Sequence, residues 1–293
     1  MATGGVRAGH PAAHRAPGLQ PPAPGRERRP RGRGHAPGRA GPGRGLPGGG
    51  AVSKGLLVVG TDTGVGKTLV CAGLTLALRR AGVQAGYLKP VASGCLPTRE
   101  GPASPDAALV ARLAGLREKP SELSPVCLAA PLAPLAAARA EGVTVEMGPV
   151  LAACQELMQA RAFTVLEGVG GLLVPLAPGA TLLDLAVGLG LPVLVVGRPG
   201  LGTVNHTLLT IEALRGRGLT VPGFAFSAAA PLPDDDLSMA GNPALVSEFC
   251  GAPFLGALPY LGPEEQLSAQ TLHRAVREHL DLEPVLRLAG VSG

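Results

Sequence analysis

The sequence KGLLVVGTDTGVGKT, residues 54–68, decides the fold of this chain. Four apolar residues, 56–59, have the length and composition of a buried parallel strand. Three glycines follow between residues 60 and 66, and Lys67 and Thr68 then open a helical pattern that runs to Ala81. A strand, a glycine-rich turn, Gly-Lys-Thr and a helix in this order predict a phosphate-binding loop.

The chemistry of this turn favours a bound phosphate. Backbone N–H groups at a helix N-terminus point toward an anion, and the helix dipole adds to the attraction. Lys67 adds a full positive charge, and the Thr68 hydroxyl can bind a magnesium ion. Gly60 lies six positions before Gly66, one residue more than the usual G-x4-G-K-[ST] spacing. The alternative interpretation is a glycine-rich turn with an incidental lysine, which the flanking strand and helix disfavour.

Composition divides the chain into two parts. Residues 1–50 hold nine arginines and one glutamate, a charge of +8, while the whole chain carries +5, so the remainder carries −3. We expect residues 1–51 to be a disordered Pro-, Gly- and Arg-rich extension, because such a segment cannot bury enough apolar surface to offset its ordering entropy. Residues 52–293 are expected to form a single domain. This domain is mildly acidic, so the basicity of the whole chain indicates nothing about nucleic acid binding by the domain, and we expect no nucleic acid partner.

Cysteine usage and hydropathy bear on the compartment. The five cysteines are scattered, odd in number and free of C-x-x-C pairs. This predicts reduced thiols in a cytoplasm rather than a disulfide framework or a zinc site. The apolar runs are far shorter than the ~20 residues that span a bilayer, so we expect no membrane partner. With 2% aromatic residues and no tryptophan, the core must consist mainly of Leu, Val and Ala.

Apolar strands alternate with helical patterns along most of the chain. Strands are expected at residues 56–59, 84–89, 163–166, 191–196, 221–226 and 254–258, and helices at 67–81, 106–113, 147–162, 182–186, 205–215 and 264–280. Residues 95–105 and 228–242 are expected as loops, 120–138 as a loop and a small helix, and the end of the chain as weakly packed. The alternation predicts an α/β fold of the P-loop NTPase type. Its sheet is mostly parallel, with helices on both faces and a ligand crevice along the carboxyl ends of the strands.

Charged residues at this edge are candidates for a site. Lys89 ends an apolar strand with no charged neighbour in sequence, which favours a phosphate or substrate contact over a solvated strand end. Glu167 follows a buried strand and precedes glycines, where P-loop proteins carry the acid that completes the magnesium shell. A surface salt bridge is the alternative for Glu167. Asp106 opens a helix, where an acid also serves as an N-cap or a first-turn acid.

These motifs resemble the ATP-dependent dethiobiotin synthetase family, whose members catalyse the penultimate step of biotin synthesis. The resemblance covers about residues 55–261, and the order of its first two motifs makes it highly specific. It rests on GTDTxVGKT at 60–68, KPVASG at 89–94, SxDA at 104–107, EGxGG at 167–171, GLGxxNH at 200–206 and LGxLPYL at 255–261.

The resemblance implies a ligase that closes a ureido ring. Diaminopelargonate (7,8-diaminononanoate) reacts with CO2 to give a carbamate, and ATP phosphorylates the carbamate to a carbamic-phosphoric anhydride. The second amine then attacks, giving dethiobiotin, ADP and phosphate. The implied cofactor is Mg²⁺, and the implied partners are ATP, diaminopelargonate, CO2 and a second copy of the chain in a homodimer, in which the substrate's tail lies near the partner subunit.

The resemblance also implies roles for individual residues. Lys67 would bind the β- and γ-phosphates, and Lys89 would stabilise the carbamate and the transferring phosphoryl group. Thr68, Asp106 and Glu167 would hold magnesium. Thr63, Ser93 and Asn205 would bind the diamine substrate. The implied nucleotide-binding residues are Gly64, Val65, Gly66, Lys67, Thr68, Leu69, Asp106, Glu167, Gly168, Val169, Gly170, Ser227, Pro259, Tyr260 and Leu261.

Two departures from the family pattern affect the nucleotide site. Ser227 stands where relatives commonly place the Asn that reads adenine, and its single hydroxyl cannot donate and accept as an amide does. We therefore expect relaxed nucleotide choice. Gly64 replaces an acidic residue that is common in the loop, which is expected to loosen the loop.

Three other functions fit the fold less well. A nucleotide-switch ATPase of the partitioning type carries an additional lysine early in the loop, and residues 61–64 contain none. A catalytically silent regulatory domain is expected to lose Lys89 or a magnesium acid, and all are present. An amide-forming synthetase of corrinoid side chains needs a glutaminase domain, for which we expect no room after Leu261.

Overall fold

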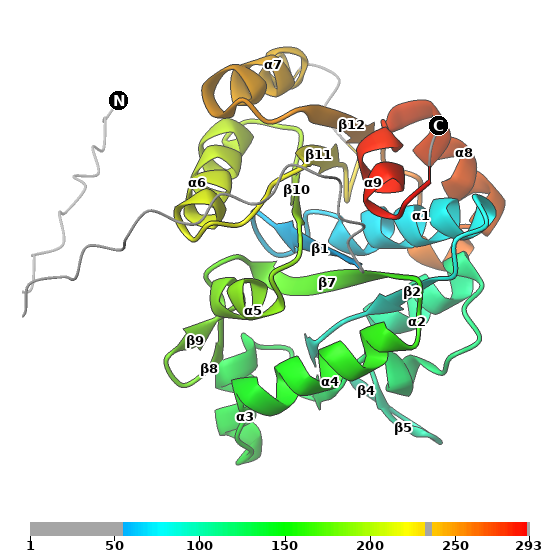
Figure 1. The fold of residues 1–293 in the computed structure, drawn as a ribbon, viewed down its shortest axis with the longest axis vertical. Helices are drawn as coiled ribbons and strands as arrows, with labels where there is room; N and C mark the ends of the chain where they lie inside the picture. The colour runs from blue at the N-terminus through cyan, green and yellow to red at the C-terminus, as the bar shows by residue number, and fades with distance from the viewer. Residues whose placement is uncertain (1–54, 232–235, 292–293) are drawn as a thin grey trace, which may run out of the picture. The chain divides into compact units, whose positions relative to one another are not determined.

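A six-stranded parallel sheet organises the fold (Figure 1), which is seen in a computed structural model that describes residues 55–231 and 236–291. The expected disordered extension, residues 1–51, lies outside the described residues, as do Asp234 and Asp235 of the acidic run. The strand order is β12-β11-β10-β1-β7-β2. These strands are β1 (Gly55–Gly60), β2 (Ala85–Leu88), β7 (Phe163–Gly171), β10 (Val193–Gly197), β11 (Gly223–Ser227) and β12 (Phe254–Leu258).

Strand register brings the candidate residues to one edge of the sheet. β1 pairs with β10 and β7, and Val58 lies opposite Glu167 of β7. β2 pairs with the other side of β7, with Leu88 opposite Leu166. Because every pairing in this sheet is parallel, the segments that follow β1, β2 and β11 leave from the same edge.

Alternate strand residues face two separate apolar cores. Leu56 and Val58 of β1 pack with one helical layer, and Leu57 and Val59 pack with the other. The first layer contains α1 (Lys67–Arg80), α2 (Pro105–Ala114), α8 (Ala269–His279) and α9 (Glu283–Leu288). The second contains α3 (Pro134–Glu141), α4 (Met147–Gln159), α5 (Leu182–Leu189), α6 (Thr203–Gly216) and α7 (Ser238–Cys250). The predicted α/β fold with helices on both faces is confirmed.

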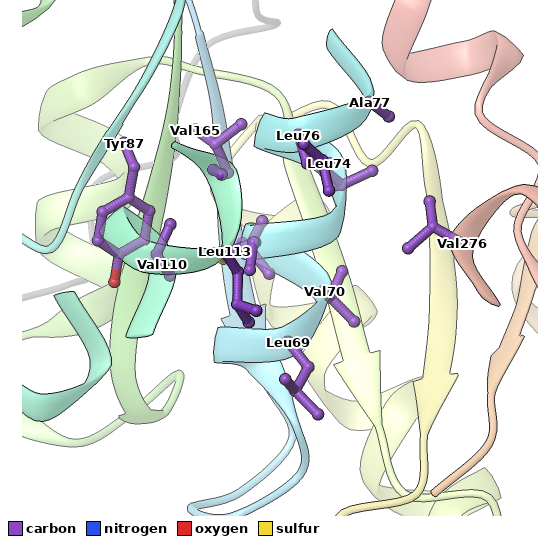
Figure 2. Close-up of a cluster of buried hydrophobic side chains, with 14 of the residues drawn as sticks. Leu69, Val70, Leu74, Leu76, Ala77, Tyr87, Val110, Leu113, Val165 and Val276 are labelled. Atoms are coloured by element: carbon purple, nitrogen blue, oxygen red, sulfur yellow. The ribbon is translucent and has the colours of Figure 1, made fainter. Parts of the chain in front are cut away.

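Helix α1 lies inside the first core rather than on its surface. Leu69, Val70 and Leu74 of α1 pack between the sheet and α8, as Figure 2 shows together with Tyr87 and Val276. Eleven of its 14 residues are buried, so the helix is apolar on nearly every side. The end of α1 that carries Lys67 and Thr68 is therefore held firmly by packing.

Two segments expected as loops contain short strands. Residues 95–105 include the hairpin of β4 (Leu96–Thr98) and β5 (Gly101–Ala103). Residues 120–138 include the 3-10 helix η1 (Pro120–Leu123) and β6 (Val126–Leu128), which pairs with β3 (Val91–Ser93). A further hairpin joins β8 (Pro175–Ala177) and β9 (Ala180–Thr181). Strands of two or three residues carry too little periodicity to be predicted, and their Pro and Gly content indicates loops.

The C-terminal third departs from the expected elements at two places. The loop expected at 228–242 ends early, because α7 begins at Ser238. Pro243 lies inside this helix, and since proline usually interrupts helices, the sequence does not predict one there. The helix expected at 264–280 is divided into the 3-10 turn η2 (Glu264–Gln266) and α8. The end of the chain packs as α9, with Val285 buried against the first core. No helix within the described residues is long and apolar enough to cross a bilayer.

Candidate active site

The turn between β1 and α1 leaves backbone donors free. Gly66 is the N-cap of α1 with φ of 84°, and within residues 55–231 and 236–291 no side chain caps the helix. The first N–H groups of α1 are therefore available to an anion. A Cβ atom on Gly66 would lie 2.3 Å from Ser227 Oγ, so both the positive φ and the close packing require glycine.

The Lys67 side chain bridges the two glycine-rich segments. Its Nζ donates to the backbone oxygens of Asp62 at 3.0 Å and Gly170 at 2.9 Å. Burial lowers the pKa of Lys67, although the negative charge of Glu167 partly opposes that effect. The lysine is thus fixed beside the free helix N-terminus, where a phosphate would lie.

Lys89 is buried between two carboxylates. Its Nζ donates to Glu167 Oε1 at 2.9 Å and also to Asp106 Oδ2, while the residue is only 4% exposed. Burial disfavours the ammonium, but Glu167 and Asp106 outweigh burial and raise the pKa of Lys89 above its usual value. Lys89 has no charged neighbour in sequence, but in the fold β7 and α2 each bring a carboxylate to it. The lysine therefore stays protonated.

Glu167 accepts hydrogen bonds at both of its oxygens. Oε1 accepts from Thr68 Oγ1 at 2.9 Å as well as from Lys89, and Oε2 accepts from the Tyr87 hydroxyl at 2.8 Å. At 1% exposure, Glu167 cannot be the surface salt bridge considered as an alternative. Tyr87 was not predicted as a site residue, and burial together with Glu167 raises the pKa of its hydroxyl well above its usual range.

Asp106 lies in the first turn of α2 and is not its N-cap. Ser104 caps the helix, accepting from the Ala107 N–H at 3.4 Å. The N-cap interpretation of Asp106 is therefore wrong, and its carboxylate is free to reach Lys89. Burial disfavours the charged carboxylate, but the Lys89 ammonium outweighs burial and lowers the pKa of Asp106.

These groups meet in one cleft of about 320 Å³. Ala229 and Glu264 also line it and were not predicted. Glu264 follows the last motif, 255–261, by three residues, and it is held at the cleft because Arg112 of α2 donates to the backbone oxygens of Glu264 and Leu267. Of the predicted residues, Thr63, Gly64, Gly66, Lys67, Thr68, Lys89, Ser93, Asp106, Glu167, Val169 and Gly170 line the cleft.

The remaining predicted residues lie outside the lining of the cleft. Val65 and Leu69 are buried in the first core, and Gly168 packs against Leu182. Ser227 is buried beneath Gly66, and its Oγ has no hydrogen-bond partner among the described residues. Asn205 is exposed on α6, and Pro259, Tyr260 and Leu261 follow β12. Their roles stay predictions.

The donor set of the cleft suits magnesium. Thr68 Oγ1 and Lys89 Nζ both bond Glu167 Oε1, and Lys89 also bonds Asp106, so one hydroxyl and two carboxylates lie around a single point. Oxygen ligands of this kind, few in number, match Mg²⁺, which keeps several waters and binds phosphate oxygens. Within the described part of the chain, no group of three or more His, Cys, Asp or Glu side chains gathers to hold a metal.

Comparison with known proteins decides the family. A family model described as an AAA domain matches residues 54–270. The ATP-dependent dethiobiotin synthetase BioD of Anaeromyxobacter sp. (strain K) is 46% identical over 207 residues, covering 71% of this chain and 90% of that protein. The chain belongs to the ATP-dependent dethiobiotin synthetase family. The family member of Thermodesulfovibrio yellowstonii is 34% identical over 242 residues, covering 80% of this chain and 99% of that protein.

Membership of the dethiobiotin synthetase family confirms the resemblance and the prediction of an enzyme. The chain is an ATP-dependent ligase of biotin synthesis, and the loop at 60–68 is its P-loop. Among solved structures, chloroplast FtsY from Physcomitrella patens gives a TM-score of 0.42 at 19% identity, covering 78% of this chain and 66% of that chain. That likeness is too low to bear on function.

Proposed function

We propose that this dethiobiotin synthetase closes the ureido ring from 7,8-diaminopelargonate and CO2. One amine and CO2 form a carbamate with loss of a proton, and the γ-phosphoryl group of ATP passes to a carbamate oxygen, releasing ADP. The second amine attacks the carbonyl carbon of this anhydride, so that a C–N bond forms and phosphate leaves. The supporting observation is Lys89, a protonated lysine buried between Glu167 and Asp106 in the same cleft as the P-loop.

The P-loop side of the cleft would position the nucleotide. The free N–H groups at the start of α1 and the Lys67 ammonium would bind the β- and γ-phosphates. Thr68, Asp106 and Glu167 would hold Mg²⁺, which supplies charge neutralisation at the phosphate oxygens when it is bound. Phosphoryl transfer depends mainly on such positioning and charge, so this part of the site needs no covalent catalyst.

Lys89 would act on the other reactant. A carbamate is an anion, and once it is phosphorylated the negative charge lies on the phosphoryl oxygens of the mixed anhydride. The positive charge of Lys89, fixed before the substrate arrives, would stabilise both the carbamate and the transferring phosphoryl group. Thr63 and Ser93, which line the same cleft, would bind the diamine and its carbamate.

We also propose a homodimer in which Asn205, exposed on α6, helps to hold the distant carboxylate of the substrate. Leu201 before this helix is 85% exposed and Leu209 within it is 61% exposed. Covering such side chains favours association. The cytoplasmic location expected from the cysteine pattern stays a prediction.

The reaction is tested by ADP release from the purified chain with Mg-ATP and bicarbonate, with and without diaminopelargonate. We expect release that requires the diamine, and a loss of at least ~10²-fold in kcat for Lys89→Ala, as expected for removal of a fixed charge from a transition state. Lys119→Ala is the matched control, because Lys119 is an exposed lysine outside the cleft. Hydrolysis that ignores the diamine, or an active Lys89→Ala variant, would overturn the proposal.

A further inference from the structure

A second polar pocket lies at the end of α1 remote from the P-loop. Helix α1 runs for 14 residues from Lys67 to Arg80, a length of roughly 20 Å. Arg80 lines a pocket of about 700 Å³ whose other lining residues all belong to α8. The pocket shares no lining residue with the candidate active site. The α8 residues are Gln270, Thr271, His273, Arg274, Arg277 and Glu278.

The three arginines of this pocket have no protein partner in the part of the chain that the structure describes. Most arginines elsewhere in that part are engaged: Arg79 and Arg112 donate to backbone oxygens, and Arg161 pairs with Glu118. No hydrogen bond or ion pair involves the side chains of Arg80, Arg274 and Arg277 among the described residues. The guanidinium groups of these three exposed arginines thus line one cavity and are bonded to no described residue, so each keeps its five N–H donors for a ligand.

Packing fixes the two helices that carry these arginines. A Cβ atom on Gly73 would lie 2.4 Å from Val276 Cγ2, so α8 crosses α1 in close contact at this glycine. Leu272 and Val276 are fully buried in the first core. Arg274 and Arg277 are spaced three residues apart and therefore emerge on the same face of α8. Their positions relative to Arg80 are set by the buried contact between the helices.

His273 adds a second observation that indicates a ligand. Its Nδ1 atom is buried and has no hydrogen-bond partner among the described residues. Burial, followed by the charges of Arg80 and Arg277, lowers the pKa of His273. The acid of the pocket, Glu278, does not offset the arginines, because three positive charges face one negative charge. A bound anion would relieve this repulsion.

We propose that this pocket binds the diphosphate or polyphosphate group of a small molecule. Guanidinium groups bind phosphate oxygens in a planar, two-pronged geometry, and three of them match the several oxygens and charges of a linked phosphate chain. The Thr271 hydroxyl and the Gln270 amide add neutral donors at the same wall. A volume of about 700 Å³ leaves room for more than the phosphates, so the remainder of the molecule would lie in the pocket too.

Calorimetric titration of the whole chain with inorganic pyrophosphate, in metal-free buffer at about 0.15 M ionic strength, tests the site. We expect two binding events, one at the P-loop and one at this pocket. Lys67→Ala should abolish the first and keep the second. Arg274→Ala with Arg277→Ala should keep the first and weaken the second more than ~10-fold, because hydrogen bonds between charged groups are the strongest kind.

Two control variants separate the pocket from general charge effects. Arg117→Ala with Arg139→Ala removes the same charge from arginines that also lack partners in the described residues, and both events should persist. Glu278→Gln removes the only acid among the described residues that line the pocket, and it should tighten binding at the pocket even if the double arginine variant fails to fold. A single binding event in the unaltered chain, a second event indifferent to Arg274 and Arg277, or equal affinity for inorganic phosphate would overturn the proposal.

Discussion

In the candidate site, Glu167 links the P-loop, which carries Lys67, to Lys89 through hydrogen bonds. One of its oxygens accepts from Thr68 of the P-loop and from Lys89, and the other accepts from Tyr87. A carboxylate buried to 1% exposure is stable only with such partners, because an unpaired buried charge is costly. The carboxylate oxygens that stabilise Lys89 here would bind Mg²⁺ when ATP is bound. The same groups would therefore contribute to folding and to nucleotide binding.

Site residues could be predicted from the sequence where they belong to one short motif. Gly66, Lys67 and Thr68 stand together between a strand and a helix, and this local pattern predicts their contact with phosphate. Tyr87 and Glu264 were not predictable, because nothing in a sequence shows that a tyrosine of one strand bonds an acid of its neighbour. Tyr87 reaches Glu167 because β2 pairs with β7 in the sheet. Glu264 lies at the cleft because Arg112 bonds its backbone oxygen.

Ser227 leads to a prediction about nucleotide choice. Its hydroxyl is buried beneath Gly66 and has no partner in the described part of the chain, and it cannot present the paired donor and acceptor of an asparagine amide. We expect kcat/KM values for GTP and CTP within about tenfold of the value for ATP, since a missing amide contact to the base contributes about 1–2 kcal/mol. Steady-state ADP, GDP and CDP release measures this.

The control for nucleotide choice is Ser227→Ala, which keeps the small volume that Gly66 requires and should leave the preference unchanged. The prediction fails if this chain discriminates against GTP and CTP as strongly as a relative that carries asparagine at the same position.

At the scale of the element, α5 shows which boundaries a sequence encodes. Thr181 is the N-cap of this helix, and Asp184 completes the cap, because its carboxylate accepts from the Thr181 N–H and hydroxyl at 2.8 Å. A capping box occupies four consecutive residues and is therefore visible in sequence. The hairpin of β4 and β5 is held by pairing between three-residue strands, and no local sequence pattern predicts it.

Asp184 gives the cap a pH dependence. Hydrogen bonds from Thr181 and Arg217 lower the pKa of this carboxylate in the folded chain. A lowered folded pKa means that the stability it contributes is present above the unfolded value, near pH 4, and is lost as pH falls through the folded value.

Asp184→Ala should therefore cost about 1 kcal/mol in the free energy of unfolding at pH 7 and less at pH 3. Urea unfolding at both pH values measures the difference, with Glu156→Ala, an exposed acid on α4, as the control. A cost that is the same at both pH values would show that the charged cap is not the source.

The crossing of α1 and α8 gives a second prediction for an element. Gly73→Ala removes the helix penalty of glycine but places a Cβ atom 2.4 Å from Val276 Cγ2. We expect a net loss of about 1–3 kcal/mol in the free energy of unfolding, because overpacking a rigid contact outweighs the gain. In a Val276→Ala background, where the clashing methyl group is absent, Gly73→Ala should cost less free energy of unfolding than it does in the unaltered chain.

Gly148→Ala on α4 is the matched control for this crossing, because no atom lies within 4 Å of the added Cβ. It should leave stability unchanged or raise it by up to about 1 kcal/mol. Equal effects of the two substitutions, measured by urea unfolding, would mean that the contact between α1 and α8 is not tight.

At the scale of the whole molecule, alternation of strands and helices predicts the architecture but not the sheet order. The two-sided apolar character of 56–59 correctly indicates a strand buried on both faces. That β1 lies between β10 and β7, strands more than 100 residues away, depends on long-range packing with no local signal. The convergence of β7, α2 and η2 on one cleft follows from that order.

The predicted homodimer belongs to this scale as well. Leu173, Leu201 and Leu209 are each more than 60% exposed, and Leu173 and Leu209 line the same apolar hollow next to the P-loop. Light scattering should give a mass of about 59 kDa, twice the 29.3 kDa of the chain. Leu209→Asp should yield monomers because it places a charge in the interface, whereas Leu96→Asp, on the exposed hairpin, should remain dimeric. A wild-type mass of 29.3 kDa would contradict the proposal.

The measurement that tests the central claim most directly is the mass of the product formed from ¹³C-labelled bicarbonate, diaminopelargonate and Mg-ATP. Ring closure as proposed incorporates one labelled carbon, so dethiobiotin should appear one mass unit heavier, with one ADP formed for each molecule. The rate of formation of both products should fall at least ~10²-fold with Lys89→Ala. Unlabelled dethiobiotin, or ADP formed without any cyclic product, would contradict the assignment of this cleft to carbamate phosphorylation and ring closure.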